Sequence, residues 1–159
     1  MRARKKLQKE QVKQMNDITV KIKTINGGKV PTYATQGSSG CDLHAISDGV
    51  IKPGERQLVK TGLFIEMPQG VEAQVRSRSG IAFKRGVIVL NSPGTIDNDY
   101  IGEIGVILYN SDNASEFRYS VGDKIAQLVF APVIKAGFEL TESITDTSRG
   151  SGGFGSTGV

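Results

Sequence analysis

Residues 52–75 read KPGERQLVKTGLFIEMPQGVEAQV, and this stretch decides the fold class. Three runs of strand length, rich in apolar and branched residues, follow one another in it: 57–60, 63–67 and 71–75. Proline and glycine stand before the first run and again between the last two, where they signal turns. Short strands divided by tight turns, without a helical period, are typical of an all-β sandwich or barrel.

The same pattern extends in both directions along the chain. Ile18, Val20 and Ile22 alternate with polar residues, which predicts a half-buried strand. Further strand candidates are residues 87–90, 103–109 and 125–130. Turn signals separate them at 26–28, 92–94 and 121–123, and the chain contains 20 glycines. A helix is expected only over residues 3–15, with a single helical turn over 79–84. An all-β fold is therefore predicted.

Length and composition place the chain among single-domain proteins. A chain of 159 residues suits one domain with a sizeable core. No window approaches the ~20 apolar residues that span a bilayer, and no secretory signal follows the basic N-terminus. Cys41 is the only cysteine, which rules out an internal disulfide and fits a reducing compartment. We expect a cytoplasmic protein without membrane contact.

The net charge of +4 is concentrated at the N-terminus. Residues 1–15 carry six basic side chains and one acid, giving +5, so the remainder sums to +4 − 5 = −1. A nucleic-acid-binding domain would line a folded face with basic residues, which this distribution does not favour. Residues 1–16 are predicted to be a flexible extension, with at most weak contacts to phosphates or lipids.

The inventory of reactive side chains excludes several chemistries. His44 is the only histidine, so zinc sites built from histidine and cysteine lack ligands. A Ser-His-Asp triad would have to use His44, and no nucleophile elbow lies near it. The zinc deaminase signature is also missing. Any proton transfer therefore falls to carboxylates.

Residues 91–103 read NSPGTIDNDYIGE and carry the strongest internal signal. The turn formers Ser92-Pro93-Gly94 lie between two strand candidates and resemble a hairpin. Asp97 and Asp99 would share one face of a strand, with Tyr100 on the other. A polar turn with solvated acids is the alternative interpretation of this segment alone.

Two further segments suit phosphate groups. Residues 76–80, RSRSG, combine arginine forks, a hydroxyl and a glycine N–H, although an exposed basic loop would look the same. Residues 149–158, RGSGGFGSTG, contain a G-x-G-x-x-G pattern that no helix follows, so a Rossmann fold is rejected. No Gly-Lys-Ser/Thr is present to form a P-loop. Such a flexible strip could close over a nucleotide, or serve as a plain linker.

Taken in order, these segments resemble the five motifs of the trimeric dUTPase family over almost the whole chain except residues 1–16. The motifs are Ser39–Leu43, Arg78–Gly80, Gly94–Glu103, Gly122–Leu128 and Arg149–Thr157. Ser39 stands where the family commonly has alanine, and Ser77 where it often has proline. The resemblance implies a jelly-roll-like β fold assembled as a homotrimer with shared active sites. Its domains would be residues 17–144, and an arm, 145–159, that closes over a neighbouring site.

The resemblance also implies an activity, the hydrolysis of dUTP to dUMP and pyrophosphate. This reaction limits uracil in DNA and supplies dUMP for dTMP synthesis. Uracil would be recognised by the hairpin from Asn91 to Asp97, largely through backbone groups. The residues concerned are Asn91, Gly94, Thr95, Ile96 and Asp97. Tyr100 would pack beneath the deoxyribose. Asp97 would bind the 3′-hydroxyl and act as general base on the water that attacks the α-phosphorus.

The remaining motifs would hold the phosphates and the metal. Arg78, Ser79, Gly80 and Gln127 would bind the phosphate chain. Mg²⁺ would be held mainly by phosphates and waters, with Asp42 contacting it through water. Phe154 would stack on uracil, while the rest of the arm approaches the β- and γ-phosphates. These arm residues are Arg149, Gly155, Ser156 and Thr157.

Two rival interpretations remain at this point. A dCTP deaminase or a bifunctional relative shares the fold, although the third and fifth motifs match the triphosphatase pattern. A regulatory protein that uses the fold to bind another protein or DNA is the second, and the basic extension is its only support.

Overall fold

The structure is a computed structural model that describes residues 18–153 and 156. These residues form eleven strands and one short helix. The strands in the first half are β1 (Lys21–Thr24), β2 (Cys41–His44), β3 (Gly49–Ile51), β4 (Arg56–Lys60), β5 (Leu63–Glu66) and β6 (Val71–Arg76). After helix α2 (Ser79–Arg85) come β7 (Val87–Val89), β8 (Gly94–Ile96), β9 (Gly105–Asn110), β10 (Phe117–Tyr119) and β11 (Lys124–Pro132).

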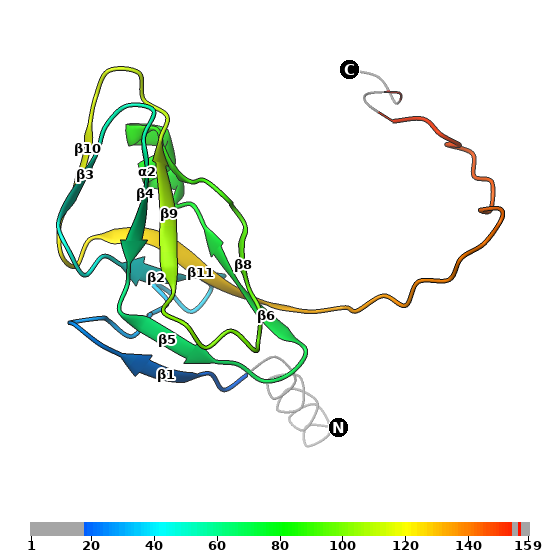
Figure 1. The fold of residues 1–159 in the computed structure, drawn as a ribbon, viewed down its shortest axis with the longest axis horizontal. Helices are drawn as coiled ribbons and strands as arrows, with labels where there is room; N and C mark the ends of the chain where they lie inside the picture. The colour runs from blue at the N-terminus through cyan, green and yellow to red at the C-terminus, as the bar shows by residue number, and fades with distance from the viewer. Residues whose placement is uncertain (1–17, 154–155, 157–159) are drawn as a thin grey trace, which may run out of the picture.

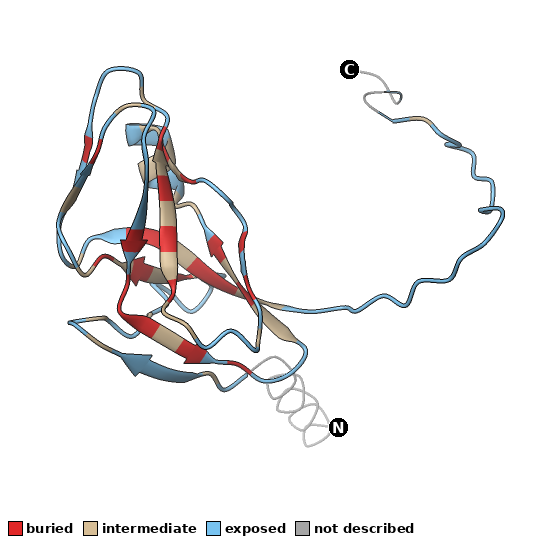
Figure 2. Ribbon diagram, in the orientation of Figure 1, coloured by how far each residue is buried: buried red, intermediate tan, exposed pale blue. Residues whose placement is uncertain are grey.

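The strands form four small antiparallel sheets that enclose one core (Figures 1 and 2). The largest has the order β2-β11-β6-β8, and a second has the order β4-β9-β7. The two-stranded sheets pair β1 with β5 and β10 with β3. Period-2 alternation explains the core, since β9 buries Val106, Leu108 and Asn110 while its intervening residues are partly exposed.

The all-β prediction is confirmed, and the strands expected at 57–60, 63–67, 71–75, 87–90, 103–109 and 125–130 are all present with small boundary shifts. Four strands were missed: β2, β3, β8 and β10. Three of them are only three residues long, too short to show a period. The expected helical turn at 79–84 is a seven-residue helix that ends on Gly86, whose positive φ of 62° closes it.

Two local expectations were wrong. The first strand begins at Lys21, not Ile18, and all four of its residues are exposed because it pairs only with β5 at the margin of the molecule. Residues 87–96 are not a paired hairpin, because β7 pairs with β9 while β8 pairs with β6. The turn at Ser92-Pro93 instead carries the chain from one sheet to another.

Beyond β11 the chain leaves the body of the molecule (Figure 1). Residues 132–151 are all exposed, including four large apolar side chains that are 88–102% exposed: Ile134, Phe138, Leu140 and Ile144. The expected extension 1–16, with its helix over 3–15, lies outside the described residues. Of the helices that the structure describes, none is long and apolar enough to cross a membrane.

Candidate active site

The large sheet brings three of the singled-out segments into one row. Central strand β11 pairs with β2 on one side and β6 on the other, so that Gln127 lies opposite both Asp42 and Arg76. Asp42 and Gln127 are only partly buried, on the face of the sheet away from buried Cys41, Leu43 and Leu128. Asp42 and Gln127, together with Arg78, line a cleft of about 350 Å³, the Arg78 cleft.

A β-bulge adds a lysine to this face. The register between β11 and β2 shifts between Lys124 and Ala126, and both Ile125 and Ala126 are buried. Strict alternation would point Lys124 and Gln127, three positions apart, to opposite faces. The extra residue in the bulge re-aims the side chain, so both of these residues line the same cleft.

Asp42 is the electrostatic centre of the cleft. Its side chain is 14% exposed. Oδ1 forms an ion pair with Arg78 Nε at 3.1 Å, and Oδ2 forms one with Lys124 Nζ at 2.7 Å. The Nη1 group of Arg78 also donates to the Lys124 carbonyl at 3.1 Å. Nε and Nη1 are both engaged, which holds the guanidinium in place, and no hydrogen bond joins its Nη2 donors to another described residue.

Glycine and serine residues fit the cleft walls closely. A Cβ on Gly40 would lie 2.7 Å from Gln127 Oε1, so a larger residue here would displace the Gln127 amide. Gln127 Nε2 donates to the Ser77 carbonyl at 2.9 Å, which fixes the amide beside Arg78. The Ser77 hydroxyl accepts the Val89 N–H at 2.8 Å, a bond that proline could not supply. Ser79 and Gly80 open helix α2, where backbone N–H groups have no carbonyl of their own helix to bind.

The singled-out residues 91–100 form a second site at the edge of the sheet. Strand β8 contains Gly94, Thr95 and Ile96, and it pairs with β6. A Cβ on Gly94 would lie 3.1 Å from Asn91 Nδ2, so the Asn91 amide packs directly over this glycine. The strand ends at Ile96, and the Tyr100 N–H donates to the Asp97 carbonyl at 3.1 Å. Asp97–Tyr100 is thus a turn, and the expectation that Asp97 and Asp99 share a strand face was wrong.

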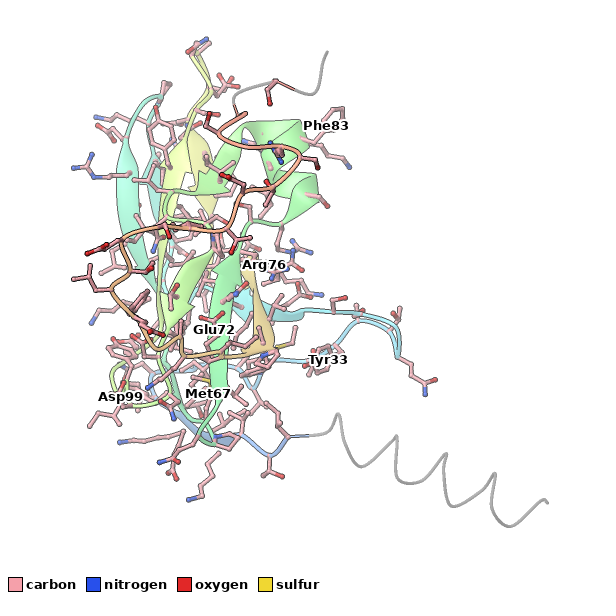
Figure 3. The ribbon with its side chains drawn as sticks, turned by 90° about the vertical axis from the view of Figure 1, so that its right-hand side faces the viewer. Tyr33, Met67, Glu72, Arg76, Phe83 and Asp99 are labelled. Atoms are coloured by element: carbon pink, nitrogen blue, oxygen red, sulfur yellow. The ribbon has the colours of Figure 1, made fainter. Side chains whose placement is uncertain are left out.

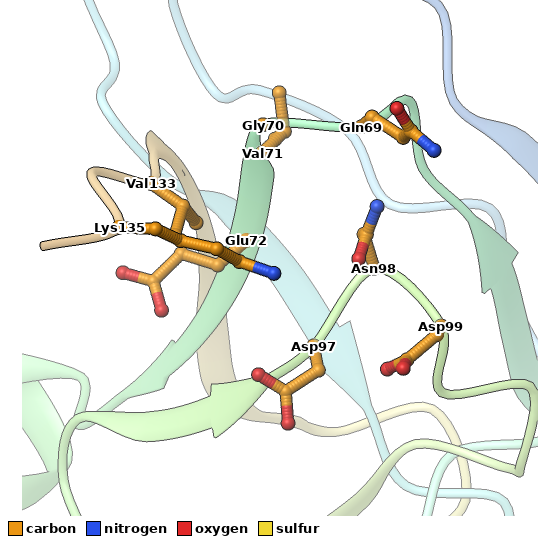
Figure 4. A pocket seen from close by; sticks show the side chains of 9 residues that line it. All are labelled: Gln69, Gly70, Val71, Glu72, Asp97, Asn98, Asp99, Val133 and Lys135. Atoms are coloured by element: carbon orange, nitrogen blue, oxygen red, sulfur yellow. The ribbon is translucent and has the colours of Figure 1, made fainter. Parts of the chain in front are cut away.

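Asp97 lies between two hollows. On one side it lines a cavity of about 540 Å³ with Asn98, Asp99, Glu72 and Lys135 (Figure 4). On the other it lines a hollow of about 190 Å³ with Thr95 and Tyr100. The exposed Asp97 carboxylate makes no hydrogen bond or ion pair with any other described residue.

Glu103 positions the segment that follows Asp97. Its carboxylate accepts the Gly62 N–H at 2.9 Å and lies 3.5 Å from Lys60 Nζ. Its carbonyl accepts the Tyr100 hydroxyl at 3.0 Å, so Tyr100 is tied to the same anchor. Glu103 therefore fastens the turn to the connection between β4 and β5.

The two sites lie at opposite ends of strand β6. The pairing of β8 with β6 sets Ile96 beside Ala73, so Asp97 follows next to Glu72. Arg78 comes six residues after Glu72, which spans about 20 Å of extended chain. In Figure 3, Arg76 lies towards helix α2, whereas Asp99 lies near Met67 at the far end of the molecule. Within one chain, Asp97 cannot reach a group bound at Arg78.

Burial lowers the pKa of His44, and the nearby Lys29 ammonium lowers it further. The ring lies two residues after Asp42 on the same strand, and its buried Nδ1 atom has no hydrogen-bond partner among the described residues. His44 is therefore neutral at neutral pH, and nothing in its surroundings marks it as a proton donor.

The arm is described only in part. Arg149 Nε donates to the Gly152 carbonyl at 2.8 Å, and Ser156 lies in a turn with Gly153. Both residues are exposed and lie on the part of the chain that leaves the body (Figure 1). Phe154, Gly155 and Thr157, to which the sequence assigned contacts with the nucleotide, lie outside the described residues.

The sequence did not reveal the roles of Lys124 and Glu103. Both stand inside the quoted motifs, yet a lysine or glutamate in a strand candidate gives no sign of its direction. The two adjacent apolar residues Ile125 and Ala126, which break strict alternation, were the available signal for the bulge.

Comparison with known proteins gives a consistent result. The family described as dUTPase matches residues 26–158. The deoxyuridine 5'-triphosphate nucleotidohydrolase of Nautilia profundicola is 52% identical over 140 residues, covering 87% of this chain and 98% of its own. The protein of the same name from Clostridium tetani is 47% identical over 145 residues, covering 91% and 99%.

Solved structures show the same fold. A mutant dUTPase of Staphylococcus bacteriophage 80alpha with dUpNHpp has a TM-score of 0.83 at 24% identity, covering 89% of this chain and 99% of that one. A mutant dUTPase from phage phi11 of S. aureus, described with a structural Mg(II) ion, has a TM-score of 0.74 at 22% identity, covering 80% and 99%.

Proposed function

The chain belongs to the dUTPase family, and from this premise we propose how its residues divide the hydrolysis of dUTP between two sites. It is a dUTP diphosphatase. Relatives that are about half identical to it carry the name deoxyuridine 5'-triphosphate nucleotidohydrolase. The observation that carries the division is the placement of the Arg78 cleft and Asp97 at opposite ends of β6. The names of these relatives also favour the triphosphatase over the deaminase interpretation.

The Arg78 cleft would bind the phosphate chain. Arg78 is anchored by Asp42 and the Lys124 carbonyl, so its free donors are oriented before any ligand arrives. The N–H groups of Ser79 and Gly80, the Ser79 hydroxyl and the second N–H of Gln127 would add neutral donors. Preorganised donors of this kind stabilise the charge that develops on a phosphate in the transition state.

The Asp97 site would bind the nucleoside and activate water. Backbone groups of Asn91–Asp97 would pair with uracil, and a site built to satisfy them discriminates sharply against bases that leave them unpaired. Tyr100, fixed by its bond to the Glu103 carbonyl, would pack beneath the sugar. Asp97 would take a proton from water as its oxygen bonds to the α-phosphorus, and the bond to the bridging oxygen would break to release pyrophosphate.

The residues of the Arg78 cleft suit a Mg²⁺ ion that is held chiefly by the phosphates of dUTP. Of the described residues that line the Arg78 cleft, only Asp42 has a carboxylate, and each of its two oxygens forms an ion pair. Mg²⁺ retains waters and is bound by one or two carboxylates together with substrate phosphates, so a single Asp42 suffices. When bound, the ion would neutralise phosphate charge and orient the chain, and Asp42 would contact it through water.

The active sites would be shared between copies of the chain. A general base must lie within hydrogen-bond reach of its water, about 3 Å, and Arg78 must reach the same phosphate group. The span of about 20 Å along β6 prevents one chain from supplying both. A second copy that places its Asp97 over the Arg78 cleft completes the site. We propose a homotrimer, as the family resemblance implies.

The arm would complete the assembly. The segment that leads to it, residues 133–144, carries Ile134, Phe138 and Leu140, which lie four and two positions apart and are 92–102% exposed. Burying each one fully would contribute about 1.5–3 kcal/mol, which a neighbouring copy could supply. The distal residues, among them Arg149 and Ser156, would then close over that neighbour's site and exclude bulk water.

The first test is Mg²⁺-dependent release of pyrophosphate from dUTP, with dCTP, dTTP and UTP in parallel. We expect release from dUTP alone, from a particle with the mass of three 17.0-kDa chains. Equal release from UTP or dTTP would refute the assignment of the 91–100 segment to base and sugar selection. Release of ammonia from dCTP would instead support the deaminase.

A mixing experiment tests the shared site. Asp97→Asn and Arg78→Gln variants are expected to be nearly inactive alone, whereas co-refolding them restores activity to about a quarter of the sites if neighbours share each site. No recovery, with mixed particles shown by mass spectrometry, would place both residues in one chain's site. Co-refolding either variant with itself is the control.

A further inference from the structure

Building on the proposed function, we propose that Lys124 is a third phosphate-binding cation, held by Asp42 in the empty cleft and transferred to the phosphate chain when substrate binds. Neither the motif pattern nor the resemblance assigned a role to this residue. Lys124 lines the same cleft as Arg78, Ser79 and Gln127.

The bulge in β11 places Lys124 in the cleft. A regular strand would turn the side chain at 124 away from the face that carries Gln127, because the two are an odd number of positions apart. The register shift between Lys124 and Ala126 reverses this and directs Lys124 to Asp42. Bulges recur next to active sites because they re-aim a side chain in this way.

The charge balance of the cleft is the second argument. Asp42 supplies one negative charge, whereas Arg78 and Lys124 supply two positive charges within 3.1 Å of its oxygens. The trio is net positive, which suits a polyanionic ligand. Among the described residues that line this cleft, no other carries a formal charge, so the trio leaves one excess positive charge for a ligand.

The exposure of the two partners is the third argument. The Asp42 side chain is 14% exposed and stays with the sheet, while the Lys124 side chain is 47% exposed at the end of a flexible stem. An ammonium group has three donors, and Asp42 takes one. A phosphate oxygen in the cleft can therefore bind the ammonium group first through a free donor and then in place of Asp42.

The experiment compares Lys124→Met and Lys124→Arg in the full-length protein. Lys21→Met is the matched control, because Lys21 makes an ion pair of the same 2.7 Å length with Glu66 on β1 and β5. Binding of deoxyuridine, dUMP and dUpNHpp is measured by calorimetry or NMR, together with KM and kcat for dUTP. Thermal melting reports whether each variant folds.

We expect Lys124→Met to weaken dUpNHpp binding about 10-fold, a typical weight for a charge-assisted hydrogen bond that is partly exposed. The loss should shrink for dUMP and vanish for deoxyuridine. KM should rise by a similar factor with a smaller change in kcat, and Lys124→Arg should restore most of the affinity. Lys21→Met should leave all of these values unchanged.

Two results would overturn the inference. A uniform loss for all three ligands would mean that Lys124 only maintains the shape of the cleft. Unchanged binding of dUpNHpp would mean that it only neutralises Asp42. Either result stands apart from the proposed function, which fails only if the unmodified protein releases no pyrophosphate from dUTP.

Discussion

The Arg78 cleft and the Asp97 turn differ in how their charges are held. In the cleft, Asp42 binds two cations and is largely withdrawn from solvent. In the turn, the Asp97 carboxylate is exposed and has no partner among the described residues. The cleft is therefore organised before ligand binding, whereas Asp97 keeps its oxygens available.

This difference matches the tasks proposed for the two regions. Groups that stabilise developing phosphate charge act best when they are fixed in advance, since they then need not reorganise during the reaction. A general base must instead keep an oxygen free for the proton of a water. A cation paired with Asp97 in the single chain would compete for that oxygen. Separating the two regions by the length of β6 lets one molecule hold both without their pairing.

The largest effect on kcat is expected at Asp97, whose carboxylate is exposed and unpaired among the described residues. Asp97→Asn should lower kcat about 10²–10⁴-fold, the usual contribution of a general base, while leaving melting temperature and dUpNHpp affinity nearly unchanged. Asp99→Asn is a control in the same turn and should have a much smaller effect on kcat. Equal losses in the two variants would mean that the charge of the turn, and not a base at Asp97, supports turnover.

The next largest effect is expected on KM at Arg78, which is held by Asp42 and the Lys124 carbonyl. Arg78→Lys keeps the charge but loses the fork that contacts both Asp42 and the Lys124 carbonyl. We expect KM for dUTP to rise about 10–100-fold, the weight of one charge-assisted hydrogen bond of 1.5–3 kcal/mol. Arg76→Lys, two residues earlier and bonded to Gln74, is the matched control. If Arg76→Lys raised KM as much as Arg78→Lys, the effect would not depend on the contacts of the Arg78 guanidinium.

Elements of this fold differ in how clearly a single sequence predicts them. Strands such as Val71–Arg76 were predicted because their apolar alternation is long enough to see. The three-residue strands β3, β8 and β10 were missed because three positions hold no period. The turn residues at 92–94 predict a hairpin over 91–97, because they mark a turn without specifying which sheets its flanks join.

In the candidate site, too, local sequence patterns were recognisable and contacts between distant strands were not. The residue types of the phosphate cleft were recognisable, since Arg78, Ser79 and Gly80 are adjacent in sequence. The link of Lys124 to Asp42 was not, because it depends on a bulge and on the pairing of strands far apart in the chain. The separation of Asp97 from Arg78 likewise arises from strand order, which local patterns do not encode.

A smaller effect is expected at Ser77, which supports the cleft from behind. Its hydroxyl accepts the Val89 N–H, while its carbonyl accepts the Gln127 amide. Ser77→Ala leaves that part-buried N–H unpaired, so we expect the free energy of unfolding to fall by about 1–2 kcal/mol. Urea unfolding measures the change, and Ser115→Ala is a control because only its backbone is bonded. An unchanged stability would show that the Val89 N–H finds another partner, such as water, when the hydroxyl is removed.

The smallest effect concerns pH and again separates the two regions. Burial, and then the Lys29 ammonium, lower the pKa of His44 beside Asp42, so the unfolded chain binds this proton more readily than the folded one. Stability should therefore fall as pH drops below the ordinary histidine pKa of about 6.5, and continue to fall until the lower folded pKa is passed. His44→Gln should flatten this part of the stability profile, measured by urea unfolding between pH 5 and 8, while Asp99→Asn, in the turn, should not. Because His44 is the only histidine, a profile that keeps its slope in His44→Gln would show that the pH response does not come from this ring.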